Sequence, residues 1–369
     1  MKNFLIASLI YISAFFASTS VANALTGMCV KDANESIVIS AAGKSGDQRQ
    51  ESNGNQKAPF NYANGYEDGE FNDNDTDACQ TQPLFYKIKF YKVALCTSDP
   101  YTGNANPDYS SCANIFNNAS GKEIIIQPDA EVDLLDGNLL LPVGSYKYLT
   151  VVTSNHIHIK HKQKYVYVDA SRAVMYGAND DGTNLNTDTC YTKAIVTTYT
   201  GQQYNGDSSY SDAHGGVTVE DTAPTESKAR MECVSGDPGS DYDYATEIID
   251  HFGDDATLVP NADYGSMLAD TGVAVELAGT MLQDDNASVA DDVDNALRLG
   301  AHFKYTNPIK ISENTVAFKL NFATTRGVSL DAGQDDDNKI FMVKVGADPF
   351  TIEAQTKTRK IRRARGNWR

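Results

Sequence analysis

Short apolar or alternating runs, each about the length of one strand, recur along most of this chain. The clearest covers residues 315–322, where large side chains alternate with smaller or polar ones: Val316, Phe318, Leu320 and Phe322. A period of two gives a strand one buried and one solvated face. Similar runs cover residues 84–95, 123–127, 133–141, 142–153, 156–161, 164–168, 302–305, 308–311 and 339–345. With turn-forming residues between them, these runs predict a mainly β fold, an antiparallel β-sandwich.

Polar stretches between these runs predict long polar loops and one or two short helices. Residues 41–83 and 177–245 are rich in Gly, Asn and Asp, so we expect mostly irregular structure there. One helix is predicted over residues 244–252. The other covers residues 286–299, where apolar side chains recur every four residues at Val289, Val293 and Leu297.

These patterns divide the chain into six parts, and the two sandwich parts would share one core. We expect a signal peptide (1–24), a loop-rich N-terminal segment (25–83), the first part of the β-sandwich (84–176), a loop-rich and partly helical insertion or second domain (177–300), the closing strands of the sandwich (301–356) and a basic tail (357–369).

The first 24 residues contain the three parts of a secretory signal peptide. Lys2 supplies a positive charge, residues 4–16 form an apolar run, and Ala22-Asn23-Ala24 is a small-x-small cleavage motif. No later stretch of the sequence approaches the ~18 apolar residues of a membrane-spanning helix. We therefore predict cleavage after Ala24 and export to the periplasm, the cell surface or the extracellular medium, with no transmembrane helix after cleavage.

All six cysteines lie beyond that cleavage point, and an even number in an exported chain predicts three disulfides. The best-supported pair is Cys96 with Cys112, because these residues bracket a turn-rich loop with two Pro and one Gly. The next nearest partners are Cys29 with Cys79 and Cys190 with Cys233. Six cysteines still allow 15 connectivities. A zinc site is disfavoured because no two cysteines have a C-x-x-C spacing.

The composition is that of a folded, acidic protein. Hydrophobic residues make up 41% of the 369 residues, enough for a core, and the formal net charge is −18. Binding to phosphate backbones requires a basic surface, so this charge argues against a nucleic-acid-binding protein. Positive charge gathers only in the tail, at Lys357, Arg359, Lys360, Arg362, Arg363, Arg365 and Arg369. That tail is interpreted either as a disordered end or as an electrostatic arm for an acidic surface.

An acidic loop is the first candidate site. Asp73, Asp75 and Asp77 stand at every second residue, and carboxylates placed in this way can converge on Ca²⁺. The loop is not an EF-hand, because Ala78 occupies the position of the turn Gly and Leu84 that of the bidentate Glu. The alternative is that these acids only solvate the surface of an acidic exported protein.

The second candidate is the histidine-rich run at residues 156–161. On a strand, His156 and His158 face the same side, as do the ligands of many zinc or copper sites. The run contains no acid, and the lysines in and beside it would repel a cation. The favoured interpretation is therefore an amphipathic strand with its two isoleucines inward.

Catalytic motifs are absent from the sequence. It contains neither G-x-S-x-G nor H-E-x-x-H, and Gly43-Lys44-Ser45 lacks the earlier Gly of a phosphate-binding loop. We therefore expect a non-enzymatic protein. Pairs of carboxylates are numerous, so a secreted hydrolase stays open as an alternative.

Two short stretches resemble part of a known bacterial module. Within residues 139–151, Leu141-Pro142-Val143-Gly144-Ser145-Tyr146 resembles the L-P-x-G-x-Y strand entry of prealbumin-like β-sandwich modules in bacterial surface proteins, and residues 307–322 are similar to a later strand pair. The resemblance implies a sandwich in which this tyrosine packs in the core, and a surface or scaffold role. It implies no catalytic residue.

Together these observations predict an exported, disulfide-stabilised, acidic protein that acts as a structural or adhesive subunit at the cell surface or outside the cell. Such a subunit would self-associate or bind another surface protein. The alternatives are a periplasmic or secreted module that binds calcium, a glycan or a peptide, and a secreted hydrolase.

Overall fold

The computed structural model describes the β-rich body of the chain and short parts of the rest. The described residues are 11–14, 29, 31–39, 77–103, 105–128, 131–133, 141–167, 175–176, 186–198, 208–219, 231–234, 236–239, 242–250, 252, 261–262, 264, 275–334, 340–347 and 351–359. Among these, no helix is long and apolar enough to cross a membrane.

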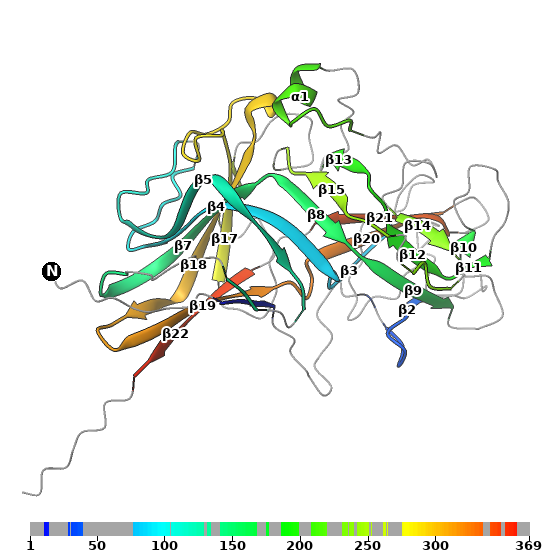
Figure 1. The fold of residues 1–369 in the computed structure, drawn as a ribbon, viewed down its shortest axis with the longest axis horizontal. Helices are drawn as coiled ribbons and strands as arrows, with labels where there is room; N and C mark the ends of the chain where they lie inside the picture. Colours follow the sequence, from blue (N-terminus) through cyan, green and yellow to red (C-terminus); the bar gives the residue numbers. More distant parts are fainter. Residues whose placement is uncertain are drawn as a thin grey trace, which may run out of the picture.

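A nine-stranded sheet forms the centre of the molecule (Figure 1). In spatial order its strands are β13 (Val196–Thr198), β15 (Ala245–Ile248), β8 (His156–Lys160), β4 (Phe85–Cys96), β7 (Gly144–Ser154), β18 (Arg298–Ile311), β17 (Val275–Leu282) and β16 (Asn261–Ala262), while β5 (Cys112–Ile126) pairs with β4 off this path. Neighbours are antiparallel except for β13 with β15. The predicted mainly β fold is confirmed.

A second sheet packs against this one and completes a sandwich. It contains β22 (Thr351–Thr358), β19 (Thr315–Ala323), β1 (Tyr11–Ala14) and β6 (Glu131–Asp133) in that order. The rings of Phe90 on β4 and Phe322 on β19 meet edge to face, with centroids 5.8 Å apart. Tyr305 on β18 donates a hydrogen bond to the Ile352 carbonyl on β22 (2.5 Å). The alternating strand predicted at residues 315–322 thus supplies one wall of the core.

Two further sheets and a two-stranded ladder extend from the sandwich toward the right of Figure 1. The first sheet contains β21 (Ile340–Ala347), β20 (Val328–Gln334) and β3 (Asp77–Thr81). The second contains β14 (Met231–Val234), β12 (Thr189–Thr192), β9 (Lys162–Tyr167) and β2 (Ile37–Ile39). The ladder pairs β10 (Met175–Tyr176) with β11 (Asn186–Thr187). The helical elements are α1 (Ser208–Ala213) and the single 3₁₀ turn η3 (Val293–Asn295).

All three predicted disulfides are present. Cys96–Cys112 joins directly paired residues of β4 and β5, and Cys190–Cys233 joins directly paired residues of β12 and β14. Cys29–Cys79 connects the N-terminal segment to β3. In each case the nearest available cysteine along the chain is also the nearest in space.

Both helices predicted from the sequence are wrong. Residues 245–248 form β15, which pairs with β8 and has all four residues buried. The helix predicted over residues 286–299 is replaced by the single turn η3, because Val289 forms a β-bridge to Leu282 and strand β18 begins at Arg298. Pairing with strands distant in sequence outweighs a helical spacing of apolar residues.

Other boundaries also shifted. The middle region expected to be mostly loop contributes β12, β13, β14 and β15 to sheets.

The runs predicted at 302–305 and 308–311 belong to one strand, β18. Its pairing is irregular between Lys304 and Ile309, where Pro308 has no N–H to donate to the ladder. Val316 is 40% exposed because the register of β19 shifts beside it. β22 extends two residues into the predicted basic tail.

Strand β5 lies at an edge of the large sheet. It is 15 residues long and pairs with β4 but with no other strand that the structure describes. A bulge interrupts the pairing, since Phe90 pairs with Lys122 and Lys92 with Asn117. Gly121 supplies the positive φ (70°) that this bulge requires. Beyond the bulge, the last five residues of β5 pair with β4 in regular register.

Candidate functional site

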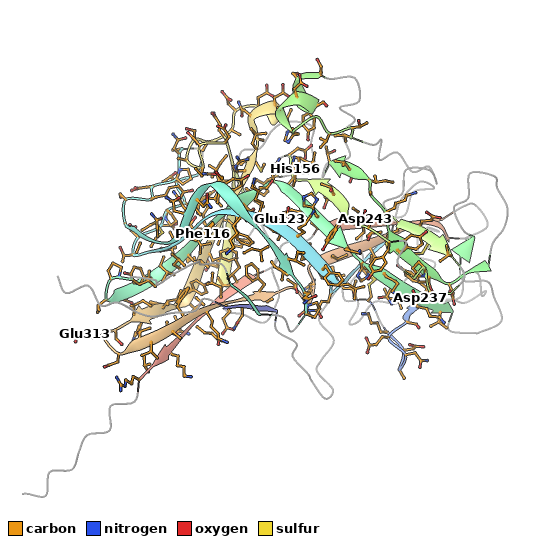
Figure 2. All side chains as sticks on the ribbon, viewed as in Figure 1. Phe116, Glu123, His156, Asp237, Asp243 and Glu313 are labelled. Atoms are coloured by element: carbon orange, nitrogen blue, oxygen red, sulfur yellow. A yellow bond between two sulfur atoms is a disulfide. The ribbon has the colours of Figure 1, made fainter. Side chains whose placement is uncertain are left out.

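Strand β8 presents its histidines on one face, as the sequence predicted. Ile157 and Ile159 are buried, while His156 and His158 are half-buried on the other side. Figure 2 shows His156 beneath the region of α1. The amphipathic interpretation of this strand is confirmed, and its polar face holds a set of hydrogen-bonded imidazoles.

His156 contacts a histidine that the sequence did not indicate. Its Nε2 lies 3.1 Å from Nδ1 of His214, and the two rings stack with centroids 5.3 Å apart. Nε2 of His214 lies 3.2 Å from the Val293 carbonyl, which can only accept. In neutral His214, Nε2 therefore donates to Val293 and Nδ1 accepts from His156. This chain of two hydrogen bonds links β8 to the residues after α1 and to η3.

Burial keeps this pair uncharged. Burial, followed by the neighbouring His214, His158 and Arg298, lowers the pKa of His156 to about 3. Burial also lowers the pKa of His214, although the Val293 carbonyl, Asp250 and Asp294 partly oppose that effect. In this neutral pair His156 donates and His214 accepts, and a proton added at Nδ1 of His214 would remove the acceptor and break the hydrogen bond.

His158 has a separate partner. Its Nδ1 lies 2.7 Å from the Thr246 hydroxyl on β15, and burial, followed by Lys87, lowers its pKa. The structure therefore brings His156 to His214 rather than using His156 and His158 together. In the described part of the chain, no group of three or more His, Cys, Asp or Glu residues is arranged to hold a metal ion.

His161 occupies the junction between two sheets, between the end of β8 and the start of β9. Its side chain is 2% exposed, and neither ring nitrogen has a hydrogen-bond partner among the described residues. Burial, followed by the charge of Lys31, lowers its pKa to about 3, so the ring is neutral. A buried imidazole without partners is costly, and such groups require an explanation.

A cavity of about 500 Å³ adjoins His161. Its lining includes apolar groups from Pro83, Leu84 and Pro128 and three lysines: Lys31, Lys162 and Lys164. Burial lowers the pKa of Lys31, which lies 3.9 Å from the exposed Glu35. Lys162 pairs with Asp237 at 2.9 Å, and Lys164 with Asp188 at 3.3 Å. Three cations thus gather around one hollow on a chain of net charge −18.

The predicted calcium loop stays a prediction. Asp73 and Asp75 lie outside the described residues, and Asp77 is known only as the first residue of β3, where its backbone pairs with Ala332.

Sequence reasoning missed the partners of the histidines. His214 is 58 residues from His156, and Thr246 is 88 residues from His158. No motif or spacing connects such positions. One local feature did point toward such partners. The alternation in residues 156–160 indicated a partly buried strand, and partly buried polar side chains need hydrogen-bond partners.

Comparison with known proteins does not extend this description: no family model, curated protein or solved structure matches the chain. Tyr146 of the prealbumin-like motif is 3% exposed, and its hydroxyl donates to the Pro142 carbonyl at 2.8 Å. That packing agrees with the expected role of the residue, while the resemblance itself stays a prediction.

Proposed function

We propose that this protein is an exported, disulfide-stabilised subunit of a cell-surface or extracellular assembly, which acts by binding other protein subunits. The three disulfides suit an oxidising compartment. The observation that carries the proposal is the long edge strand β5, which is paired on one side only by the strands that the structure describes.

The regular end of β5 is suited to receive another strand. Ile124 and Ile126 are buried, whereas Glu123 and Ile125 are exposed, Ile125 by 45%. An edge strand presents main-chain N–H and C=O groups that another chain can pair with. A nearby exposed apolar side chain adds buried area to such a contact.

Light scattering coupled to size-exclusion chromatography tests this proposal. The oxidised chain from residue 25 onward should form species larger than a monomer as its concentration rises. Ile125→Lys places a charge on the edge strand and should raise the concentration needed for assembly by about tenfold. Val143→Lys is the matched control, because Val143 is 53% exposed and lies outside β5.

Two results would contradict the proposal. One is a monomer at every concentration with no partner captured from the exported proteins of the source cells. The other is equal assembly by Ile125→Lys, Val143→Lys and the unchanged protein, which would assign the contact to another surface.

A second candidate function is the binding of a small acidic sugar in the cavity beside His161. The specific observation is that three lysines outnumber the two acids, Glu35 and Asp237, in the lining of one hollow of ligand size, which also contains apolar groups. A carboxylate would interact with the lysines in competition with their acidic neighbours Glu35, Asp237 and Asp188, and hydroxyl groups could donate to those acids. A thermal-shift screen should show stabilisation by sugar acids and none by their neutral parent sugars, and Lys31→Met should reduce the effect.

A further inference from the structure

The second sheet of the sandwich contains a strand from the predicted signal peptide. β1 (Tyr11–Ala14) lies between β19 and β6 and is the darkest blue arrow beside β19 in Figure 1. It pairs in parallel with residues 320–322 of β19 and antiparallel with β6. Cleavage after Ala24 would remove this strand and leave β19 and β6 without a common neighbour.

We infer that the exported chain uses the place of β1 as an acceptor for an extended strand from a partner subunit. This inference rests on the proposed export and subunit role. The acceptor lies between two strands, so its occupant must form backbone hydrogen bonds along both edges. A free extended segment can do this, whereas an edge strand of a folded sheet has only one edge to offer. The acceptor is therefore distinct from the edge of β5.

The register defines the chemistry of the occupant. In the register of β1 with β19, Ile12 stands opposite Leu320 and Ala14 stands opposite Phe322. Leu320 is 1% exposed and Phe322 is 0% exposed. Residues directly opposite each other share a face of the sheet. The occupant therefore needs apolar residues at alternate positions and no charge at those positions. It is a short β-strand of another subunit with apolar residues at alternate positions, and its insertion completes the core that Phe322 shares with Phe90 on β4.

Binding in trans is the direct test. The oxidised chain from residue 25 onward would be mixed with a synthetic peptide of residues 9–16, with lysines added at both ends for solubility. The peptide should slow amide hydrogen exchange in residues 318–323 and 131–133 by about tenfold or more and raise the melting temperature. The same peptide with Ile12→Asp and Ala14→Asp is the matched control and should do neither.

The outcomes separate this inference from the proposed function. Protection of β19 and β6 in a chain that remains monomeric would uphold the acceptor and indicate that the natural donor is a different protein. Self-assembly that the peptide neither blocks nor alters would uphold a structural role and overturn the acceptor. Mass spectrometry showing that the exported chain retains residues 11–14 would also overturn it, because β1 would then keep its place.

Discussion

The buried histidines dominate the residue scale, because each carries two nitrogens that need partners or cost stability. His302 shows the paired case: its Nδ1 lies 3.0 Å from the Thr150 hydroxyl and its Nε2 lies 3.3 Å from the Thr280 hydroxyl. His161 shows the opposite case, with no partner for either nitrogen in the described part of the chain. Substitution should therefore affect the two residues in opposite directions.

We expect His161→Phe to leave the free energy of unfolding at pH 7 unchanged or to raise it by about 1 kcal/mol, because an unpaired buried polar group is removed. His302→Phe should lower that free energy by about 1–3 kcal/mol, since it removes the hydrogen bonds that His302 makes to two buried hydroxyls. Urea unfolding of both variants measures this difference. A loss of stability in His161→Phe that matches the loss in His302→Phe would show that the His161 nitrogens are paired in solution.

The same burial predicts sensitivity to acid. The pKa values of His156, His161 and His302 are lowered to about 3, against about 6.5 in an unfolded chain. Between these values the unfolded state binds protons that the folded state does not, so stability is complete above pH 6.5 and falls as the pH drops. Each histidine contributes a loss of about 1.4 kcal/mol per pH unit.

Urea unfolding at pH 6 and pH 5 should show this fall before most carboxylates titrate. His302→Gln can still interact with Thr150 and Thr280, and it should remove the share of His302, up to about 1.4 kcal/mol per pH unit, while the other histidines whose pKa is lowered keep theirs. An unfolding free energy that is equal at the two pH values would contradict the predicted neutral state of these residues.

At the scale of elements, disulfides join strands that already pair. Cys190–Cys233 spans 43 residues and Cys96–Cys112 spans 16. In the chain-entropy model the longer loop contributes about 4 kcal/mol and the shorter about 3 kcal/mol. The double variants Cys190→Ser/Cys233→Ser and Cys96→Ser/Cys112→Ser should lose stability in that order in urea unfolding. A larger loss for the shorter loop would contradict the entropic account.

The wrong helices show how pairing in a sheet overrides local spacing. Apolar residues at intervals of four near Val289 satisfied a helical pattern, but β17 and β18 on either side of this segment pair with each other. The segment is consequently a connection between two antiparallel strands, with room for one turn, η3. The sequence also missed β20 and β22, which are partly polar, and their pairing with β21 and β19 compensates for weak alternation.

At the scale of the whole molecule, the excess of negative charge bears on the predicted calcium loop. A cation bound by Asp73, Asp75 and Asp77 would join a chain of net charge −18 and should stabilise it. At a calcium concentration 100 times the dissociation constant, the gain is about 2.7 kcal/mol. The melting temperature of the unchanged chain should rise when calcium is added and fall back to its starting value when EDTA is added. In the variant with all three acids replaced by Asn, calcium should not change the melting temperature.

The loop at Asp335, Asp336 and Asp337 provides a control for charge, because it carries three acids that are consecutive rather than placed at every second residue. Replacing these three acids by Asn should preserve the response to calcium. An equal response in both triple variants and in the unchanged chain would place the ion elsewhere or indicate general screening.

Properties that depend on neighbouring residues could be predicted from the chain alone. The mainly β class, the strands β4, β7, β8, β9 and β19, and all three disulfides follow from alternation, turn residues and the distance between cysteines. The inward isoleucines of residues 156–160 follow in the same way, since a strand has a period of two.

Properties that depend on distant residues required the folded molecule. His214 meets His156 only because α1 and η3 pack beside β8, and the cavity beside His161 exists only because β8 and β9 belong to different sheets. The pairing of β1 with β19 joins residues more than 300 positions apart. Local patterns report which face of a strand is buried, but the strand that covers that face is chosen by packing across the whole chain.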